Sequence, residues 1–162
     1  MRFSNKELEK FSKQIILKKI GAIGQKKIMS SKVLVIGAGG LGCTLMLYLA
    51  NTGISHIGIA DNDLVELSNL NRQILFTTND IGKLKVVQAK KVIKSINKQA
   101  KINIYKKRIN ESNIENIIKD YDIICDGTDN FKSRYLINDY CLKNKKILIS
   151  AAISKFDGQL FK

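Results

Sequence analysis

The sequence has few cysteines, few arginines and no long apolar run, and each scarcity narrows the class of protein. It contains no proline and no tryptophan, and its three cysteines, Cys43, Cys125 and Cys141, form no C-x-x-C pair. That pattern argues against a disulfide scaffold and against a complete zinc site, and it favours a cytoplasmic location. No apolar run approaches the ~20 residues that a membrane-spanning helix needs, so we expect no membrane segment. The first 14 residues are too charged for a secretory signal, and an apolar content of 44% excludes a disordered chain.

The net charge of +14 comes almost entirely from lysine. The chain has 24 lysines and only four arginines, which are Arg2, Arg72, Arg108 and Arg134. Lysine, isoleucine and asparagine together supply 63 of the 162 residues, and their A/T-rich codons offer a genomic cause for the basicity. The lysines are also dispersed along the chain. We therefore expect a solvated basic surface and no nucleic-acid partner.

The hydrophobic pattern predicts a single domain over residues 1–162, with helices in 1–30 and a nucleotide-binding core in 31–162. Ser4 and Glu7 have capping-box spacing, and Gly21 suits the residue that follows a helix C-terminus. We expect helices over residues 5–20, 25–29, 43–51, 83–97, 112–119 and 131–142. We expect strands over residues 32–36, 56–60, 101–105, 122–125, 146–150 and 159–161. This alternation favours a doubly wound α/β fold of Rossmann type, with a mostly parallel sheet covered on both faces.

A glycine-rich segment, Gly37-x-Gly39-Gly40-x-Gly42, lies directly between a predicted strand and a predicted helix. Such a loop lets the backbone approach a phosphate, which the amides at the helix N-terminus then face. Asp61 follows Gly42 by 19 residues, at the end of the next strand, where a carboxylate can accept hydrogen bonds from ribose hydroxyls. Together these features predict adenine-nucleotide binding. The alternative is a turn that serves packing alone, with Asp61 at a solvated strand end.

Arg72 and Lys85 are the candidate cations for a phosphate chain. Arg72 stands in a polar loop beyond the carboxyl end of a strand, where such folds bind ligands. In a chain that otherwise uses lysine, an arginine there suggests a multi-donor grip on phosphate. An NADP 2′-phosphate would be repelled by Asp61, and a plain surface arginine is the other alternative. Lys85 falls in the first turn of a helix, where the macrodipole disfavours a cation unless an anion lies nearby, and a solvated lysine is equally open.

The segment Cys125-Asp126-Gly127-Thr128-Asp129-Asn130 follows a buried strand on the same side of the predicted sheet. Carboxylates at that place suit Mg²⁺, which is often shared between one or two protein carboxylates and substrate phosphates. The alternative is that Asp129 or Asn130 caps the next helix.

The motifs occur in the order found in the ThiF/MoeB/HesA adenylyltransferases, which are bacterial relatives of ubiquitin-activating enzymes. The matching segments are Gly37–Gly42, Asp61-x-Asp63, Ser68-Asn69-Leu70-Asn71-Arg72-Gln73, Gly82-x-x-Lys85-Val86 and Thr128-Asp129-Asn130. Residues 11–17 also resemble the family's N-terminal helix, so the resemblance extends over essentially the whole chain.

This resemblance implies an ATP- and Mg²⁺-dependent enzyme that activates a ubiquitin-like sulfur-carrier protein of the molybdopterin or thiamine pathways. The C-terminal carboxylate of the carrier's Gly-Gly end would attack the α-phosphate of ATP, giving an acyl-adenylate and pyrophosphate. By the same resemblance, Gly40 lies against the phosphates, Asp61 holds the ribose, and residues 68–72 border the triphosphate. Arg72 and Lys85 would neutralise charge in the transition state, while Asp129 would place Mg²⁺ with Asn130 beside it.

The sequence departs from the family pattern at two points. Lys13 stands where the family usually has an arginine that reaches the ATP site of the partner across a homodimer, and lysine loses the bidentate fork. Family members also continue beyond the position of residue 162, so we expect this chain to lack the family's zinc site, crossover loop and acceptor cysteine. Two other functions stay open, an NAD(P)-dependent oxidoreductase and a tRNA-directed member of the same family.

Overall fold

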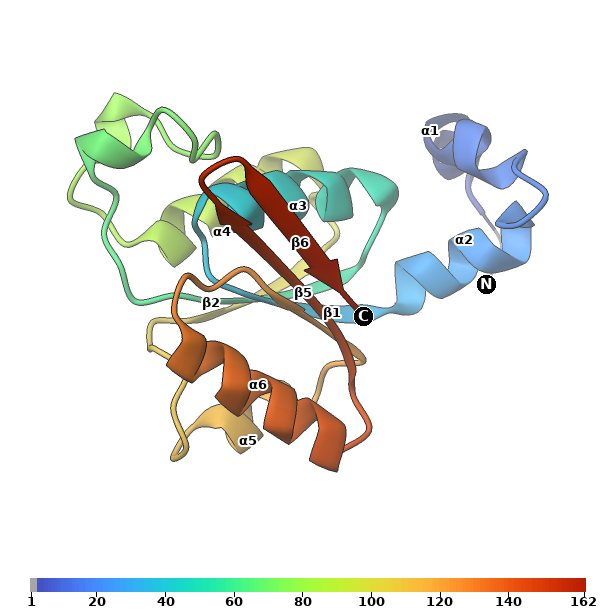
Figure 1. The fold of residues 1–162 in the computed structure, drawn as a ribbon. Helices are drawn as coiled ribbons and strands as arrows, with labels where there is room; N and C mark the ends of the chain where they lie inside the picture. Colours follow the sequence, from blue (N-terminus) through green and yellow to red (C-terminus); the bar gives the residue numbers. More distant parts are fainter. Residues whose placement is uncertain (1–2) are drawn as a thin grey trace.

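A computed structural model describes residues 3–162, of which residues 32–162 form three layers (Figure 1). A six-stranded sheet separates two pairs of helices. The helices α3 (Gly40–Thr52) and α4 (Lys85–Ile96) cover one face of the sheet, and α5 (Ile114–Ile118) and α6 (Phe131–Lys143) cover the other. Each face has its own buried apolar cluster, one with Met46 and Ile93 and the other with Tyr121 and Ile137. The predicted doubly wound α/β fold is confirmed.

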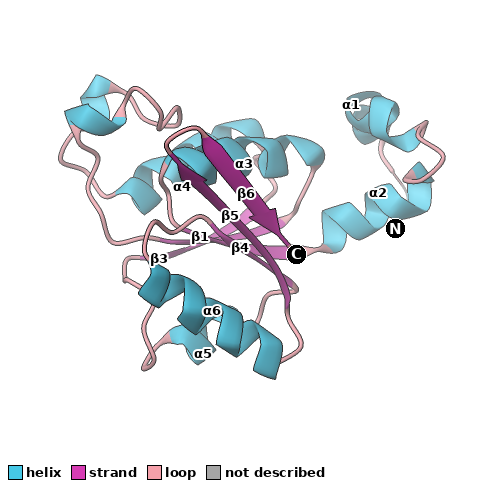
Figure 2. Cartoon of the chain, viewed as in Figure 1, coloured by secondary structure: helices cyan, strands magenta, loops and turns pink. Residues whose placement is uncertain are grey.

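The sheet has the strand order β3-β2-β1-β4-β5-β6, and all neighbours are parallel except the last pair (Figure 2). Its strands are β1 (Lys32–Ile36), β2 (His56–Ala60), β3 (Lys101–Tyr105), β4 (Ile123–Asp126), β5 (Ile147–Ser154) and β6 (Asp157–Phe161). The order of the strands reverses between β1 and β4, and ligands of doubly wound sheets bind at such a switch point, beyond the carboxyl ends of the strands. The antiparallel β6 lies at one edge of the sheet and is exposed along its length.

The N-terminal segment corrects two predicted boundaries. The expected helix over residues 5–20 ends at Ile15, as α1 (Asn5–Ile15), and the expected helix over 25–29 begins earlier, as α2 (Gly21–Ser30). Between them the chain forms tight turns, in which the Ile20 N–H donates to the Leu17 carbonyl at 2.9 Å. Gly21 is the first residue of α2 and does not directly follow α1, and its φ of +59° is a conformation that glycine adopts readily. The capping box of Ser4 and Glu7 is confirmed.

The remaining elements begin and end close to the predicted residues. The helix α3 begins inside the glycine loop at Gly40, because the Gly39 carbonyl already accepts from the Cys43 N–H at 2.9 Å. The strand β5 continues to Ser154, four residues beyond its predicted end, because it pairs with β6 in a hairpin. Two short 3₁₀ helices, η1 (Leu67–Asn69) and η2 (Thr78–Asp80), shape the long loop after β2. That loop folds back over the carboxyl edge of the sheet, where it forms one wall of the candidate site.

Candidate functional site

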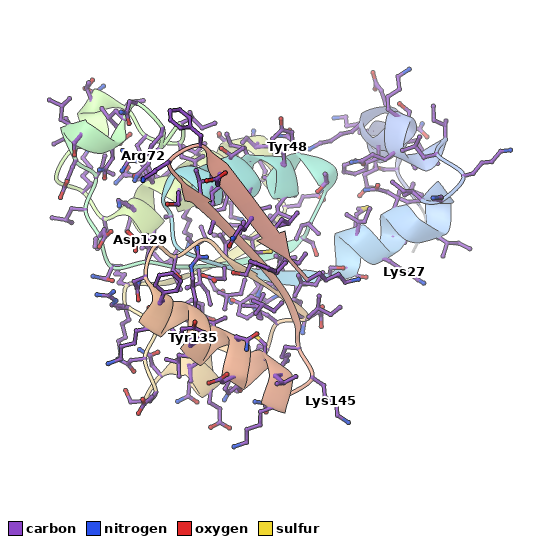
Figure 3. The ribbon with its side chains drawn as sticks, in the orientation of Figure 1. Lys27, Tyr48, Arg72, Asp129, Tyr135 and Lys145 are labelled. Carbon is purple, nitrogen blue, oxygen red and sulfur yellow. The ribbon has the colours of Figure 1, made fainter. Side chains whose placement is uncertain are left out.

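A cleft of about 850 Å³ opens at the carboxyl edge of the parallel strands. Five segments border it: the β1–α3 glycine loop, the loop after β2, the residues after β3, the β4–α6 loop, and the C-terminal part of β5. Figure 3 shows Arg72 and Asp129 on the side of the domain that lies away from α1 and α2. The cleft therefore brings together residues that are far apart in the sequence, as expected at a topological switch point.

The glycines of the first loop have two different roles. Gly37, Gly39 and Gly40 line the cleft, and a Cβ on Gly39 would meet nothing within 4 Å. Gly42 does not line it, because its Cα faces the turn itself: a Cβ there would lie 1.9 Å from the Gly37 carbonyl oxygen. The loop can thus bring its backbone against a phosphate only because Gly42 lets the first turn of α3 pack onto it.

Asp61 joins the glycine loop to the loop after β2. Its Oδ2 accepts from the Ala38 N–H at 2.7 Å, and its Oδ1 accepts from the Asp63 N–H, also at 2.7 Å. Each carboxylate oxygen can accept more than one hydrogen bond. The side chain is therefore fixed at the cleft wall while it retains lone pairs for the hydroxyls of a sugar.

Lys85 is the first residue of α4 and is only 5% exposed, although it is a lysine. Its Nζ donates to Asp63 Oδ2 at 3.0 Å, and its backbone N–H donates to the Asp63 carbonyl at the same distance. Both residues line the cleft. The predicted position of Lys85 in the first turn of a helix is confirmed, and a carboxylate supplies the nearby negative charge that such a cation requires.

Arg72 is held in place by its own loop. Its Nη1 donates to the Ser68 carbonyl and to Asn71 Oδ1, each at 3.1 Å. Its Cγ lies 3.5 Å from the point where a Cβ on Gly40 would stand, so the arginine passes directly over the glycine loop. Among the predicted residues of this loop, Asn69 and Arg72 line the cleft. Ser68, Leu70 and Asn71 do not line it, and Ser68 and Asn71 instead support the guanidinium of Arg72.

Gln73, the next residue, is a polar side chain buried in the cleft wall. It is 3% exposed, and its Oε1 has no hydrogen-bond partner among residues 3–162. A buried acceptor oxygen without a hydrogen bond costs free energy, and a donor group of a ligand would remove that cost. The sequence motif included Gln73, but only its burial distinguishes it from an ordinary surface residue.

The β4–α6 loop shows which of its residues caps the next helix. Asn130 caps α6, because its Oδ1 accepts from the Ser133 N–H at 2.9 Å. Asp129 is exposed at the rim of the cleft, and within residues 3–162 its side chain accepts one hydrogen bond, from Asn130 Nδ2 at 3.5 Å. Its carboxylate oxygens thus remain available, and they are the hard ligands that Mg²⁺ prefers. Within residues 3–162 no group of three or more His, Cys, Asp or Glu side chains is placed to hold a metal ion by itself.

The structure adds three basic cleft residues that the sequence did not identify. Arg108 and Lys107 follow β3, and Arg134 is the fourth residue of α6. Three of the four arginines in the chain thus line one cleft. The rarity of arginine was the available sequence signal, but only Arg72 stood in a motif.

Lys13 and the cysteines lie outside the cleft. Lys13 is an exposed residue of α1, which Figure 1 shows beyond the opposite end of the sheet. All three cysteines are buried, and burial raises the pKa of each thiol to about 11. A thiol with so high a pKa is a weak nucleophile at neutral pH. None of the helices in the described part of the chain is long and apolar enough to cross a bilayer.

Comparison with protein families matches residues 11–162 to the ThiF family. Among curated relatives, a probable molybdopterin-synthase adenylyltransferase from Porphyra purpurea is 49% identical over 158 residues, which are 98% of this chain and 41% of the relative. A sulfur carrier protein adenylyltransferase from Thermus thermophilus is 39% identical over 160 residues, which are 99% of this chain and 59% of the relative. The chain therefore spans about half the length of these two relatives.

Solved structures agree with the fold. The E. coli tRNA N6-threonylcarbamoyladenosine dehydratase TcdA, solved in complex with ATP, superposes with a TM-score of 0.86 at 24% identity. The match covers 93% of this chain and 61% of TcdA. E. coli MccB, solved with AMPCPP and MccA, superposes with a TM-score of 0.74 at 31% identity, over 79% of this chain and 38% of MccB.

Proposed function

The chain belongs to the ThiF family, and from that premise we propose that it is the ATP-binding part of an adenylyltransferase. Its substrate would be a ubiquitin-like sulfur-carrier protein with a C-terminal Gly-Gly, whose terminal carboxylate becomes an acyl-adenylate. The names of two relatives support this proposal, since one is a molybdopterin-synthase adenylyltransferase and the other acts on a sulfur carrier protein. The molybdopterin pathway is accordingly favoured over the thiamine pathway.

The single observation on which the proposal depends is the convergence of four groups around one cleft. These are the glycine loop at the N-terminus of α3, Asp61 at the end of β2, the cations Arg72 and Lys85, and Asp129. An adenosine ribose would donate to Asp61, and the phosphates would lie along Gly39 and Gly40 toward the two cations. A hydride-transfer enzyme needs the glycine loop and Asp61, but it has no comparable use for paired cations opposite a carboxylate.

Adenylation of a carboxylate requires the protein mainly to bind the two substrates and to stabilise the developing charge. A carboxylate oxygen of the carrier forms a bond to the α-phosphorus, and the bond from that phosphorus to the pyrophosphate oxygen breaks. Arg72 and Lys85 stabilise the negative charge that grows on the phosphate oxygens, and both are already fixed by hydrogen bonds before the reaction. Mg²⁺ bound by Asp129 and the phosphates would add further charge neutralisation.

The placement of α1 bears on the expected homodimer. Lys13 is exposed on a helix that lies away from the cleft of its own chain, so it could contact a nucleotide only in a second copy. We therefore propose a homodimer in which Lys13 of one protomer adds a cation to the cleft of its partner. As a lysine it would act as a point charge instead of a two-pronged donor.

The test is carrier-dependent exchange of labelled pyrophosphate into ATP. The account predicts exchange only when ATP, Mg²⁺ and a carrier ending in Gly-Gly are all present. Calorimetric titrations separate the alternatives: tighter binding of NAD(H) than of ATP–Mg²⁺ would favour an oxidoreductase. The structural likeness to TcdA concerns the fold alone. A tRNA-directed role would require tRNA binding that does not depend on pyrophosphate exchange and that persists at raised salt concentration.

A further inference from the structure

The topology divides the cleft into two halves. Asp61 lies beyond β2, and Lys107 and Arg108 lie beyond β3, so the proposed adenosine occupies the half on that side of the glycine loop. The other half is bordered by the β4–α6 loop and by β5. The proposed adenosine leaves this second half open, so a second substrate that attacks the α-phosphate would enter there. The residues that line it include Arg134, Ala152 and Ile153.

Arg134 is anchored in this half by neutral groups alone. Its Nε donates to the Thr128 carbonyl at 3.0 Å, and its Nη2 donates to the same carbonyl and, at 2.8 Å, to the Ala151 carbonyl. These bonds tie the β4–α6 loop to β5 and fix the plane of the guanidinium. The arginine is partly buried and lines the cleft.

Two properties of Arg134 remain unused by these contacts. A guanidinium has five N–H groups, and the two on Nη1 have no partner within the described chain. Its positive charge is also unpaired, because no carboxylate of the described residues lies within 4.0 Å of its nitrogens. Asp126, the buried carboxylate that ends β4, instead accepts from the N–H and Oγ1 of Thr128 and from Ser150 Oγ. A fixed guanidinium with free donors and no counter-charge is a binding group for an anion.

We propose that Arg134 binds the terminal carboxylate of the second substrate and aims it at the α-phosphate. This inference rests on the proposed function and adds a residue that recognises the carrier to those that recognise ATP. Carboxylate and phosphate would otherwise repel each other, and a cation on the far side of the carboxylate reduces that repulsion. Ala152, which lines the same half of the cleft, has a small side chain and would leave room for a glycine tail.

The test uses three short peptides and the full 162-residue chain saturated with a non-hydrolysable ATP analogue and Mg²⁺. One peptide ends in a free Gly-Gly carboxylate, the second in a Gly-Gly amide, and the third is an amide with its carboxylate on a glutamate side chain. Binding is followed by NMR, including the Nε–H signal of Arg134. We expect the free carboxylate to bind at least about tenfold more tightly than either amide, and to shift the Arg134 signal.

Variants on α6 then assign the preference. Arg134→Gln should abolish the preference for the free carboxylate, while its affinity for the ATP analogue stays within about twofold of the wild type. Arg134→Lys should retain part of the preference, because it keeps the charge. Lys132→Gln, which removes an exposed cation outside the cleft from the same helix, should bind all three peptides like the wild type.

Several outcomes would overturn the inference. They are equal binding of carboxylate and amide peptides by the wild type, an unmoved Arg134 signal, or a preference that survives in folded Arg134→Gln. The wild-type measurements decide the matter even if the glutamine variant does not fold. Loss of pyrophosphate exchange with the carboxylate preference intact would instead contradict the proposed reaction and leave Arg134 as a carboxylate-binding residue.

Discussion

Lys85 Nζ lies 3.0 Å from Asp63 Oδ2, and the two side chains differ sharply in exposure, at 7% for the lysine and 61% for the aspartate. The pair therefore joins a buried cation to a solvated anion. Lys85 pays a desolvation cost, whereas Asp63 keeps most of its hydration. Because of this asymmetry, we expect removal of Asp63 and removal of Lys85 to have different effects on the free energy of unfolding.

Asp63→Ala should lower the free energy of unfolding by about 1–2 kcal/mol, because it leaves the buried ammonium of Lys85 without its charged partner. Lys85→Met should change the free energy of unfolding by less than about 1 kcal/mol. The solvated Asp63 does not need the ammonium, and the methionine side chain fills the buried space of the lysine stem. The methionine variant should nevertheless lose adenylation. Urea unfolding and pyrophosphate exchange measure the two effects separately, with Asp63→Asn as the control that retains an acceptor oxygen. A stability loss that is larger for Lys85→Met than for Asp63→Ala would contradict this interpretation.

Arg72→Ala and Asp129→Ala should each lower the rate of adenylation at least ~100-fold, as expected when one preorganised electrostatic group is removed from a transition state. Both side chains are exposed at the cleft rim, so the fold should stay intact. Circular dichroism and exchange kinetics are the measurements. Lys143→Ala, at the exposed C-terminal end of α6, is the matched control and should be neutral. A near-normal rate of pyrophosphate exchange in either variant would contradict the role assigned to the residue that it replaces.

The strands were predictable because their signal is local. Residues 32–36 are an almost continuous apolar run and residues 101–105 alternate apolar with polar side chains, and the structure has β1 and β3 at those bounds. The end of α1 was not predictable from the sequence. The residues around Gly21 fit a glycine that follows one helix as well as a glycine that begins the next. The positions of the two helices decide between them, because α1 already ends at Ile15 and Gly21 is the first residue of α2.

The site was predictable only where a motif occurs within one segment. Asp61, Lys85 and Arg72 stood in such segments, and the structure places all three at the cleft. Arg134 did not, because its partners Thr128 and Ala151 are 6 and 17 residues away and meet it only through the packing of α6 on β5. The cap formed by Asn130 was one of two open alternatives, and only the distance to the Ser133 N–H distinguishes them.

Gly42→Ala and Gly39→Ala should separate packing from binding within the glycine loop. A Cβ on Gly42 would lie 1.9 Å from the Gly37 carbonyl oxygen, which is backbone, so we expect a loss of stability of about 3 kcal/mol or more. A Cβ on Gly39 meets nothing within 4 Å, and that variant should fold normally while its methyl group weakens nucleotide binding. Thermal unfolding and calorimetry test both statements. Equal stability of the two variants would be inconsistent with the assigned roles.

His56 lies on the face of the sheet covered by α5 and α6, remote from the cleft. Its Nε2 is 3.0 Å from Asn103 Nδ2, and its ring meets the ring of buried Tyr121 edge to face. If the amide of Asn103 donates, Nε2 must be unprotonated to accept. Burial is the main cause that lowers the pKa of His56, with Lys101 and Lys32 adding to it and Asp120 and Asp122 opposing it.

This lowered pKa predicts the sign of one contribution to stability. The folded state binds fewer protons than the unfolded state near the ordinary histidine pKa of 6.5. The stabilisation is therefore present above that pH and is lost as the pH falls through the lower pKa of the folded state. We expect the wild type to lose stability relative to His56→Asn between about pH 7 and pH 5. Urea unfolding at several pH values measures the difference, and parallel pH profiles would refute the prediction.

The origin of the oxygen atoms in AMP tests the central claim most directly. A Gly-Gly carrier labelled with ¹⁸O in its terminal carboxylate is incubated with the chain, ATP and Mg²⁺, and the adenylate is released with hydroxylamine, which attacks the carbonyl carbon. If the carboxylate attacks the α-phosphorus, one ¹⁸O atom passes to AMP and appears in its mass spectrum. AMP that contains no ¹⁸O, formed under the same conditions, would show that water and not the carrier attacks ATP, and would contradict the account.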